Sequence, residues 1–173
     1  MKGLLLLIPF FLVRFGFISL LNKEAVKRAA YFPTLVGKEV VAYWIYQFSN
    51  VAIFVYLLFL KTKSEPLWLF YIGVGTYVSG LILCLFSIIN FAIPSKNGIN
   101  QNGLYRFSRN PMYLSYFICF IGCVLLTQSL VLFEFVSLFQ ITAHWIILSE
   151  ERWCMNKFGE EYIQYMKKVR RYI

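Results

Sequence analysis

Long apolar runs separated by short polar segments dominate the chain. A helix needs about 20 predominantly apolar residues to cross a bilayer, and three runs in the first half of the chain meet that length. The run from 112 to 148 is too long for one helix, and Thr127-Gln128-Ser129 offers a polar turn that would divide it. The expected transmembrane helices are residues 3–21, 40–60, 67–93, 112–126 and 130–148, with Pro94 ending the third.

The first run is interrupted by Pro9, Arg14 and Gly16. A basic residue followed by apolar residues is also typical of a cleaved signal peptide. The run is longer than a signal core and no small-residue cleavage site follows it, which favours a retained helix. A charged side chain such as Arg14 is costly inside a membrane unless it reaches the interface or faces a partner or water.

The pattern changes after the last run, where apolar side chains recur every three or four residues among charged ones. This spacing predicts an amphipathic helix that lies along the membrane surface. The predicted fold is therefore all-α: a polytopic membrane helical bundle of about five transmembrane helices plus a C-terminal amphipathic interfacial helix, forming a single domain over residues 1–173. The positions that share the apolar face are Phe158, Tyr162, Tyr165, Val169 and Tyr172.

The amino-acid composition also indicates a membrane protein. The chain is 60% hydrophobic and only 14% charged, whereas a soluble domain carries about 25% charged residues. The net charge of +9 therefore indicates orientation and contact with anionic lipid rather than nucleic-acid binding. Cys119 and Cys123 lie inside an apolar run, and the lone His144 does not complete a zinc site, so no metal is predicted.

Basic residues concentrate on one side of a five-helix topology. Segments 22–39, 94–111 and 149–173 share that side and hold most of the lysines and arginines, while Lys2 and the turn at 61–63 lie opposite. Cytoplasmic segments are enriched in Lys and Arg. The polar loop before residue 112 and the C-terminus are therefore both expected to be cytoplasmic.

A polar cluster stands between two of the apolar runs at residues 103–113, GLYRFSRNPMY. Proline is favoured in the first turn of a helix and asparagine at its N-cap. The hairpin formed by the next two helices would return the chain to the same side, bringing Glu150 and Glu151 close to this cluster. Its chemistry-bearing residues are two arginines, two tyrosines and the helix start: Arg106, Arg109, Tyr105, Tyr113, Asn110 and Pro111.

The chain resembles the isoprenylcysteine carboxyl methyltransferase and phospholipid methyltransferase group of integral membrane enzymes. The resemblance lies in this motif, in the acidic pair after the hairpin and in the segment KFGEEYIQYMKKVRR that follows. That group carries roughly G-x-Y-R-x-x-R-H-P-x-Y, a membrane hairpin, E-E, and then F-G-x-x-Y-x-x-Y-x-x-x-V-x-R. The histidine before the proline is Asn110 here. Asparagine cannot take up a proton at neutral pH, so no acid–base role is expected at that position.

The resemblance implies S-adenosyl-L-methionine as cofactor, bound by residues 103–113 and 144–173. Arginine suits the cofactor's carboxylate, with Arg109 expected first and Arg106 second, beside the free N–H groups at the helix start. Glu150 or Glu151 suits the ammonium and ribose. Adjacent helical residues point about 100° apart, so only one faces the pocket, and Glu150 is preferred. The other expected cofactor contacts are Tyr105, Asn110, Pro111, Tyr113, Gly73 and Gly75.

The implied reaction is direct methyl transfer to a nucleophile of an amphiphilic or lipid-like acceptor. A carboxylate acceptor needs no base, whereas a protonated amine or a thiol must lose a proton. The candidate bases are Glu150, Glu151 and His144, the last because a polar residue in a spanning helix suggests a site. Arg109 completes the expected catalytic set.

The acceptor stays open at this point: isoprenylcysteine carboxylate, phospholipid amine and small thiol are all compatible with the motif. Two further alternatives are a membrane reductase of the steroid 5α-reductase type with a nicotinamide cofactor, and a scaffold whose basic loops bind only membrane lipids. The spacing of the arginine motif and the glutamate pair favours the methyltransferase. Nucleic-acid and metal partners are not expected, and the oligomeric state is open.

Overall fold

The computed structural model describes residues 1–21, 23–29, 31–93 and 98–172. Within these ranges the chain is helical, and its extended backbone pairs only at an isolated bridge between Lys2 and Lys61. The predicted all-α membrane bundle is confirmed. Pro94, expected to end the third span, lies outside the described residues.

In the described part of the chain, four helical stretches are long and apolar enough to cross a membrane. The first, Leu4–Leu21, is built from α1 (Leu4–Phe11), a π-helical turn η1 (Leu12–Phe17) and α2 (Ile18–Leu21). A fifth apolar helix, α6, is shorter at 17 residues. The other helices of the bundle are α4 (Lys38–Phe59), α5 (Leu67–Ala92), α6 (Pro111–Thr127) and α7 (Leu130–Phe158).

The helix α7 continues ten residues beyond the predicted end at 148, so that end was wrong. Charged residues do not stop a helix, and Glu, Arg, Met and Lys are good helix formers. The helix ends where Gly159 adopts a positive φ of 58°, a conformation that glycine reaches without steric cost. Glu150 and Glu151 therefore lie inside α7, not at the start of a new helix.

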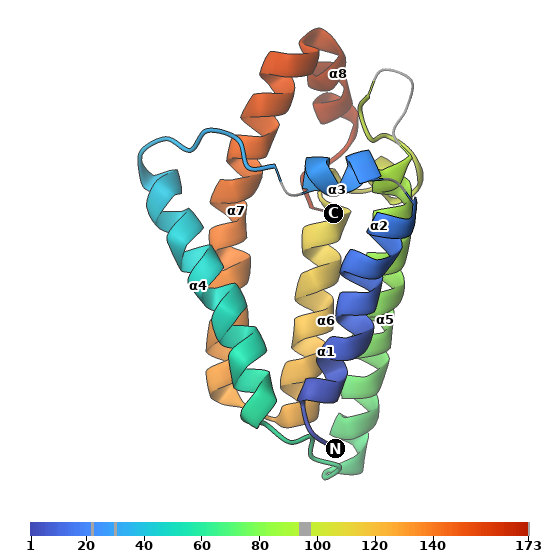
Figure 1. Ribbon diagram of the computed structural model, residues 1–173, viewed down its shortest axis with the longest axis vertical. Helices are drawn as coiled ribbons and strands as arrows, with labels where there is room; N and C mark the ends of the chain where they lie inside the picture. The colour runs from blue at the N-terminus through green and yellow to red at the C-terminus, as the bar shows by residue number, and fades with distance from the viewer. Residues whose placement is uncertain (22, 30, 94–97, 173) are drawn as a thin grey trace.

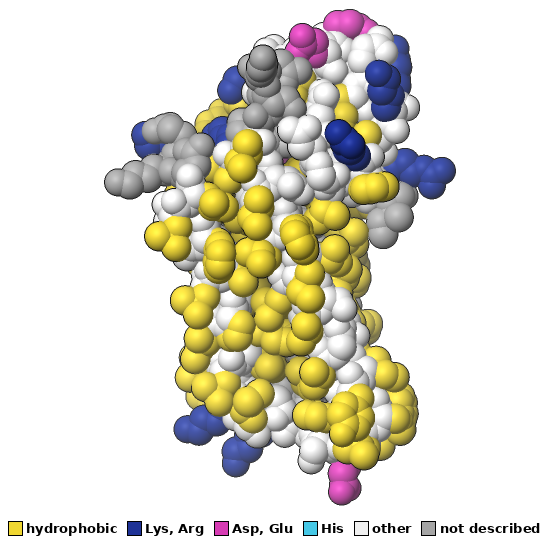
Figure 2. All heavy atoms as spheres, turned by 90° about the vertical axis from the view of Figure 1, so that its right-hand side faces the viewer, with side chains coloured by type: hydrophobic (Ala, Val, Ile, Leu, Met, Phe, Trp, Pro, Cys, Tyr) yellow, Lys and Arg dark blue, Asp and Glu magenta, His cyan; other side chains and the backbone are white. Residues whose placement is uncertain are grey.

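The helices form two pairs that run the length of the molecule. In Figure 1, α4 lies beside α7, while α5 lies beside α6 with the first span against them. Figure 2 shows apolar side chains covering the length of the bundle, with charged side chains at its two ends. This distribution is what a bilayer-spanning protein requires, because lipid surrounds the middle and water its ends.

Two glycines let α5 and α6 approach closely. A Cβ built on Gly80 would lie 2.4 Å from the backbone nitrogen of Cys119, and one on Gly122 would lie 2.5 Å from the backbone of Tyr77. Small residues at such positions are typical of membrane helix contacts. This packing sets the position of α6, whose first turn carries the end of the GLYRFSRNPMY motif.

Substitution of Gly80 with alanine is expected to lower the free energy of unfolding in detergent by about 1–3 kcal/mol, the usual cost of overpacking. The matched control is Gly75→Ala on the same helix, where an added Cβ meets nothing within 4 Å. Thermal unfolding of the two variants checks this. Equal stability of Gly80→Ala and Gly75→Ala would contradict the close contact.

Three short elements cover the end of the bundle that holds the motif: α3 (Lys23–Ala29), the 3₁₀ turn η2 (Gly103–Arg106) and α8 (Glu160–Lys168). The amphipathic helix after the last span is present as α8, with Tyr162 and Tyr165 on its buried face. The helix α8 ends at Lys168, whereas the predicted apolar face extended to Tyr172. Val169 adopts extended backbone, so residues 169–172, here called the C-terminal strap, leave the helix and turn back toward the motif.

Candidate functional site

A cavity of about 670 Å³ opens at the motif end of the bundle. Its wall is formed by the first span, α3, α4, the end of α5, the motif loop, α6, α7 and α8. Of the residues expected at the site, six line it: Tyr105, Arg109, Asn110, Tyr113, Glu150 and Glu151. The others, which do not line it, are Arg106, Pro111, His144, Gly73 and Gly75.

The motif loop begins at a glycine held against α5. Gly103 has a φ of +56°, and an added Cβ would lie 2.1 Å from the Oδ1 atom of Asn90. That oxygen accepts a hydrogen bond from the backbone N–H of Leu104 at 3.0 Å. Asn90 thus fixes the start of η2, and a side chain at position 103 would displace the Asn90 amide from this bond and strain the backbone at a positive φ.

Pro111 starts α6, as its sequence context predicts, and Asn110 occupies the N-cap position. The Asn110 side chain does not cap the helix, however. Its Nδ2 donates to the backbone carbonyl of Arg171 in the C-terminal strap at 3.1 Å, and its own N–H donates to Ser108 Oγ at 3.2 Å. Asn110 therefore links the motif loop to the end of the chain.

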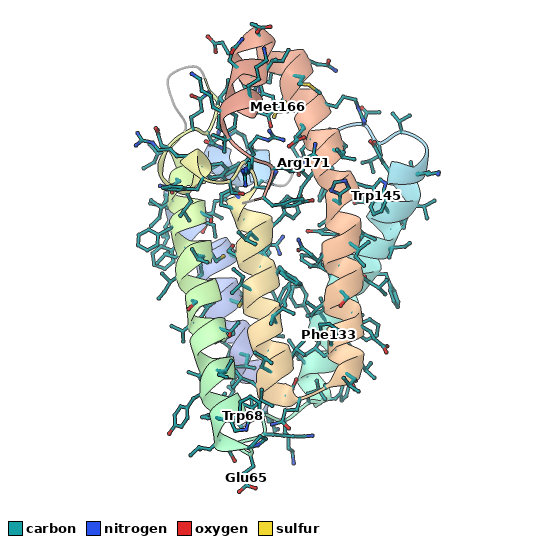
Figure 3. All side chains as sticks on the ribbon, turned by 180° about the vertical axis from the view of Figure 1, so that it is seen from behind. Glu65, Trp68, Phe133, Trp145, Met166 and Arg171 are labelled. Carbon is teal, nitrogen blue, oxygen red and sulfur yellow. The ribbon has the colours of Figure 1, made fainter. Side chains whose placement is uncertain are left out.

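Glu151 forms a buried ion-pair cluster with two arginines, here called the carboxylate clamp. Arg109 donates from Nε and Nη2 to Oε1 at 3.0 and 2.7 Å, and Arg171 donates from Nη2 to Oε2 at 2.8 Å. The side chains of Arg109 and Glu151 are only 7% and 4% exposed, and that of Arg171 is 30% exposed. Figure 3 shows Arg171 on the segment after α8, close to α7.

The remaining bonds of Arg109 also go to the protein. Its Nη1 donates to the carbonyls of Met166 and Val169 at 3.0 and 2.9 Å, and its backbone N–H donates to the carbonyl of Arg170 at 3.0 Å. Every nitrogen of the Arg109 guanidinium is thus engaged by Glu151 or by the C-terminal part of the chain. This arrangement makes Arg109 a positioning residue that ties the motif loop to α7, α8 and the C-terminal strap.

Glu150 points elsewhere than Glu151, as adjacent positions on a helix require. Its Oε1 accepts a hydrogen bond from the Tyr113 phenol at 2.8 Å. No described side chain bonds its Oε2, and Glu150 lines the cavity. The motif and the Glu150–Glu151 pair are therefore in contact, and Glu150 is the carboxylate with an oxygen available to a ligand.

Several expected site residues lie away from the cavity. His144 Nδ1 lies 2.8 Å from the Tyr172 hydroxyl of the C-terminal strap. Arg106 is exposed. Gly73 packs against Leu125 and Leu126 of α6. Within the described ranges, no three His, Cys, Asp or Glu side chains gather as a metal site would need.

The phenol side chains of Tyr105, in η2, and Tyr165, in α8, line the cavity. The Tyr165 hydroxyl donates to the backbone carbonyl of Tyr105 at 2.7 Å. Burial raises the pKa of both phenols above the ordinary value, because a phenolate would be poorly solvated there. Both side chains stay protonated at neutral pH, so they can donate hydrogen bonds and offer aromatic faces but cannot act as bases.

The sequence analysis did not predict three residues that contribute to this region. Arg171 stands in a basic tail, where a solvated arginine is the ordinary expectation, and Asn90 is hidden in an apolar span. Asn100 lines the cavity, and its buried Oδ1 has no hydrogen-bond partner among the described residues. Buried polar atoms are nearly always bonded, so this oxygen is a candidate ligand contact. An asparagine inside a polar loop carries no signal that would have found it.

The family model described as phospholipid methyltransferase matches residues 68–161, which is more than half of the chain. The matched part runs from α5 through the motif loop and the α6–α7 hairpin into α8, and so contains Tyr113, Glu150 and the Arg109–Glu151 pair. No curated protein and no solved structure matches the chain. The resemblance read from the motif is confirmed, and the chain belongs to the phospholipid methyltransferase family of membrane enzymes.

Proposed function

We propose that this protein transfers a methyl group from S-adenosyl-L-methionine to a lipid-like acceptor at the cytoplasmic face of the membrane. The family itself comprises methyltransferases that act on lipid-like substrates. The observation that carries the proposal is the position of Glu150, which has a free carboxylate oxygen on the wall of a 670 Å³ cavity and is oriented by Tyr113 of the motif. The basic segments around that cavity support a cytoplasmic orientation.

The cavity fits the cofactor in size and in chemistry. Small-molecule sites are commonly about 300–1,000 Å³, mostly apolar and with a few polar groups. Here Glu150 Oε2 can accept from an ammonium or from ribose hydroxyls. Asn100 Oδ1, which is buried and has no partner among the described residues, can accept from an exocyclic amine or a hydroxyl. The face of Tyr105 provides a surface for a base or a sulfonium.

The cofactor, when bound, supplies an electrophilic methyl group on a sulfonium. The chain's own residues hold and orient it. We assign the ammonium or ribose to Glu150 and the carboxylate to the first turn of α6, whose N–H groups have no acceptor within the helix. Arg109 and Glu151 act beneath that turn by fixing the C-terminal strap, and Arg106, exposed outside the cavity, is not assigned a contact.

The need for a base depends on the acceptor. An isoprenylcysteine carboxylate needs none, whereas a phospholipid ammonium or a thiol must lose a proton. Glu150 is then the group we assign, because it lines the cavity and no described side chain bonds its Oε2. His144 is engaged with Tyr172 outside the cavity wall, so we assign it no proton transfer. Alignment of donor and acceptor is the enzyme's main contribution, worth up to about 7–11 kcal/mol.

Calorimetry with S-adenosylhomocysteine, the demethylated cofactor, tests the proposal in purified detergent-solubilised protein. We expect the parent to bind and Glu150→Gln to bind about tenfold more weakly, because a hydrogen bond to a charged group is worth about 1.5–3 kcal/mol. The control is Glu134→Gln, an exposed carboxylate on the same helix, which should bind like the parent. Failure of the well-folded parent to bind would overturn the proposal.

A further inference from the structure

Arg14 is a cavity residue that the proposed methyl transfer leaves unused. It lies in η1, the π-helical turn of the first span, and faces the cavity. π-Helical turns are rare and occur frequently at functional sites. A cation inside a spanning helix is costly and is usually retained for a functional reason.

Among the described side chains, no carboxylate forms an ion pair with Arg14. Its guanidinium carbon lies 4.5 Å from the ring centroid of Tyr116 and 5.3 Å from that of Phe15. Among the described side chains, carboxylates pair with arginines only in the carboxylate clamp and between Glu39 and Arg152. Aromatic faces stabilise a cation by about 0.5–2 kcal/mol, which does not replace a counter-ion in an apolar setting.

The position of Arg14 relative to α6 places it on the membrane side of the cavity. Tyr116 lies five residues after Pro111, so the contact is roughly 8 Å below the start of α6 at a rise of 1.5 Å per residue. The first span and α5 give this wall the apolar side chains Phe15, Ile18 and Ile88. The groups beside Arg14 on α4 and α6 are the neutral phenols of Tyr46 and Tyr116. The polar groups Asn100 and Glu150 belong to the loop end and to α7.

We propose that Arg14 binds the anionic group, a carboxylate or a phosphate, of an amphiphile that enters the cavity from the membrane. Arginine is suited to both groups because its planar fork makes paired hydrogen bonds. The side chains of Phe15, Ile18 and Ile88 on the same wall suit a hydrocarbon chain. Identification of this amphiphile as the methyl acceptor rests on the proposed function. The anion site itself does not.

Thermal unfolding in dodecyl maltoside micelles tests the site without cofactor. Dodecanoate and dodecyl phosphate are titrated as anionic probes and dodecyltrimethylammonium as the cationic probe of equal chain length. A ligand that binds the native state raises Tm, so the anions should raise the Tm of the parent and of Arg14→Lys beyond the cation's effect. In Arg14→Gln and Arg14→Met the apparent affinity for the anions should fall at least about tenfold.

The variants without charge are expected to unfold at or above the parent's Tm, because they remove a buried cation that no described carboxylate pairs with. An unchanged anion-specific shift in both variants, or the lack of such a shift in the parent, would overturn the anion site. S-Adenosylhomocysteine calorimetry separates the two sources of anion. Unchanged cofactor affinity in Arg14→Gln supports the amphiphile, whereas a tenfold loss assigns Arg14 to the cofactor carboxylate and overturns the proposal. If the parent binds no S-adenosylhomocysteine but keeps the anion-specific shift, the proposed function fails and the anion site stands.

Discussion

Glu151→Gln is expected to lower the free energy of unfolding by about 3–5 kcal/mol, the cost of removing one partner from a buried ion pair. The substitution leaves the guanidinium of Arg109, which is 7% exposed, beside that of Arg171 with no carboxylate between them. Two like charges in a site of low polarity repel each other and cannot regain the solvation lost on burial. Thermal or chemical unfolding in detergent measures the loss.

Two controls show whether the clamp is responsible. Glu134→Gln removes an exposed carboxylate from the same helix and should change stability by no more than about 0.5 kcal/mol. Arg171→Gln should cost less than Glu151→Gln, because Arg171 is 30% exposed and Glu151 keeps Arg109. Equal stability of Glu151→Gln and Glu134→Gln would contradict the buried clamp.

The sequence predicts most of the bundle because the bilayer imposes one requirement on every span: its backbone must be satisfied internally and its surface must be apolar. The expected helix at 112–126 corresponds to α6 at Pro111–Thr127, and the turn after it adopts the left-handed conformation at Gln128. The end of α7 was misjudged because a change from apolar to charged residues marks the edge of the membrane and not the end of a helix. Gly159, eleven residues after the predicted end at 148, ends it.

The motif and its spacing predict which residues lie close together in the fold. They do not predict which of these residues bond to each other. The hairpin argument brings Glu150 and Glu151 to the motif, and the contact of Glu150 with Tyr113 follows from it. The expectation for Arg109 considered a ligand carboxylate only. In the folded chain the same guanidinium finds Glu151 and two backbone carbonyls. Competition from a distant part of the chain cannot be read from the spacing of a motif.

Among the protein groups that bond to the motif loop, those of the C-terminal strap are expected to have the largest effect on function. Ending the chain after Lys168 removes the carbonyls of Val169, Arg170 and Arg171 that accept from the motif loop, together with the Arg171 side chain of the clamp. The loop then keeps the Arg109–Glu151 pair and the Met166 carbonyl but loses every contact with the strap. A displacement of about 1 Å at a positioned group can cost about 100-fold in rate, so we expect cofactor-dependent methyl incorporation into membrane lipid extract to fall by about that factor.

Amide hydrogen exchange and a matched variant identify the cause of this loss. The Arg109 N–H, which donates to the Arg170 carbonyl at 3.0 Å, should exchange faster in the truncated protein, while amides in the middle of α5 and α6 keep their protection. Full-length Tyr172→Phe removes only the hydroxyl that meets His144 and should retain the parent's methyl transfer. A truncated protein with parental transfer would show that the motif loop holds its position alone. Reduced transfer in Tyr172→Phe would return His144 to the set of functional residues, because the strap would then act through that contact rather than through the carboxylate clamp.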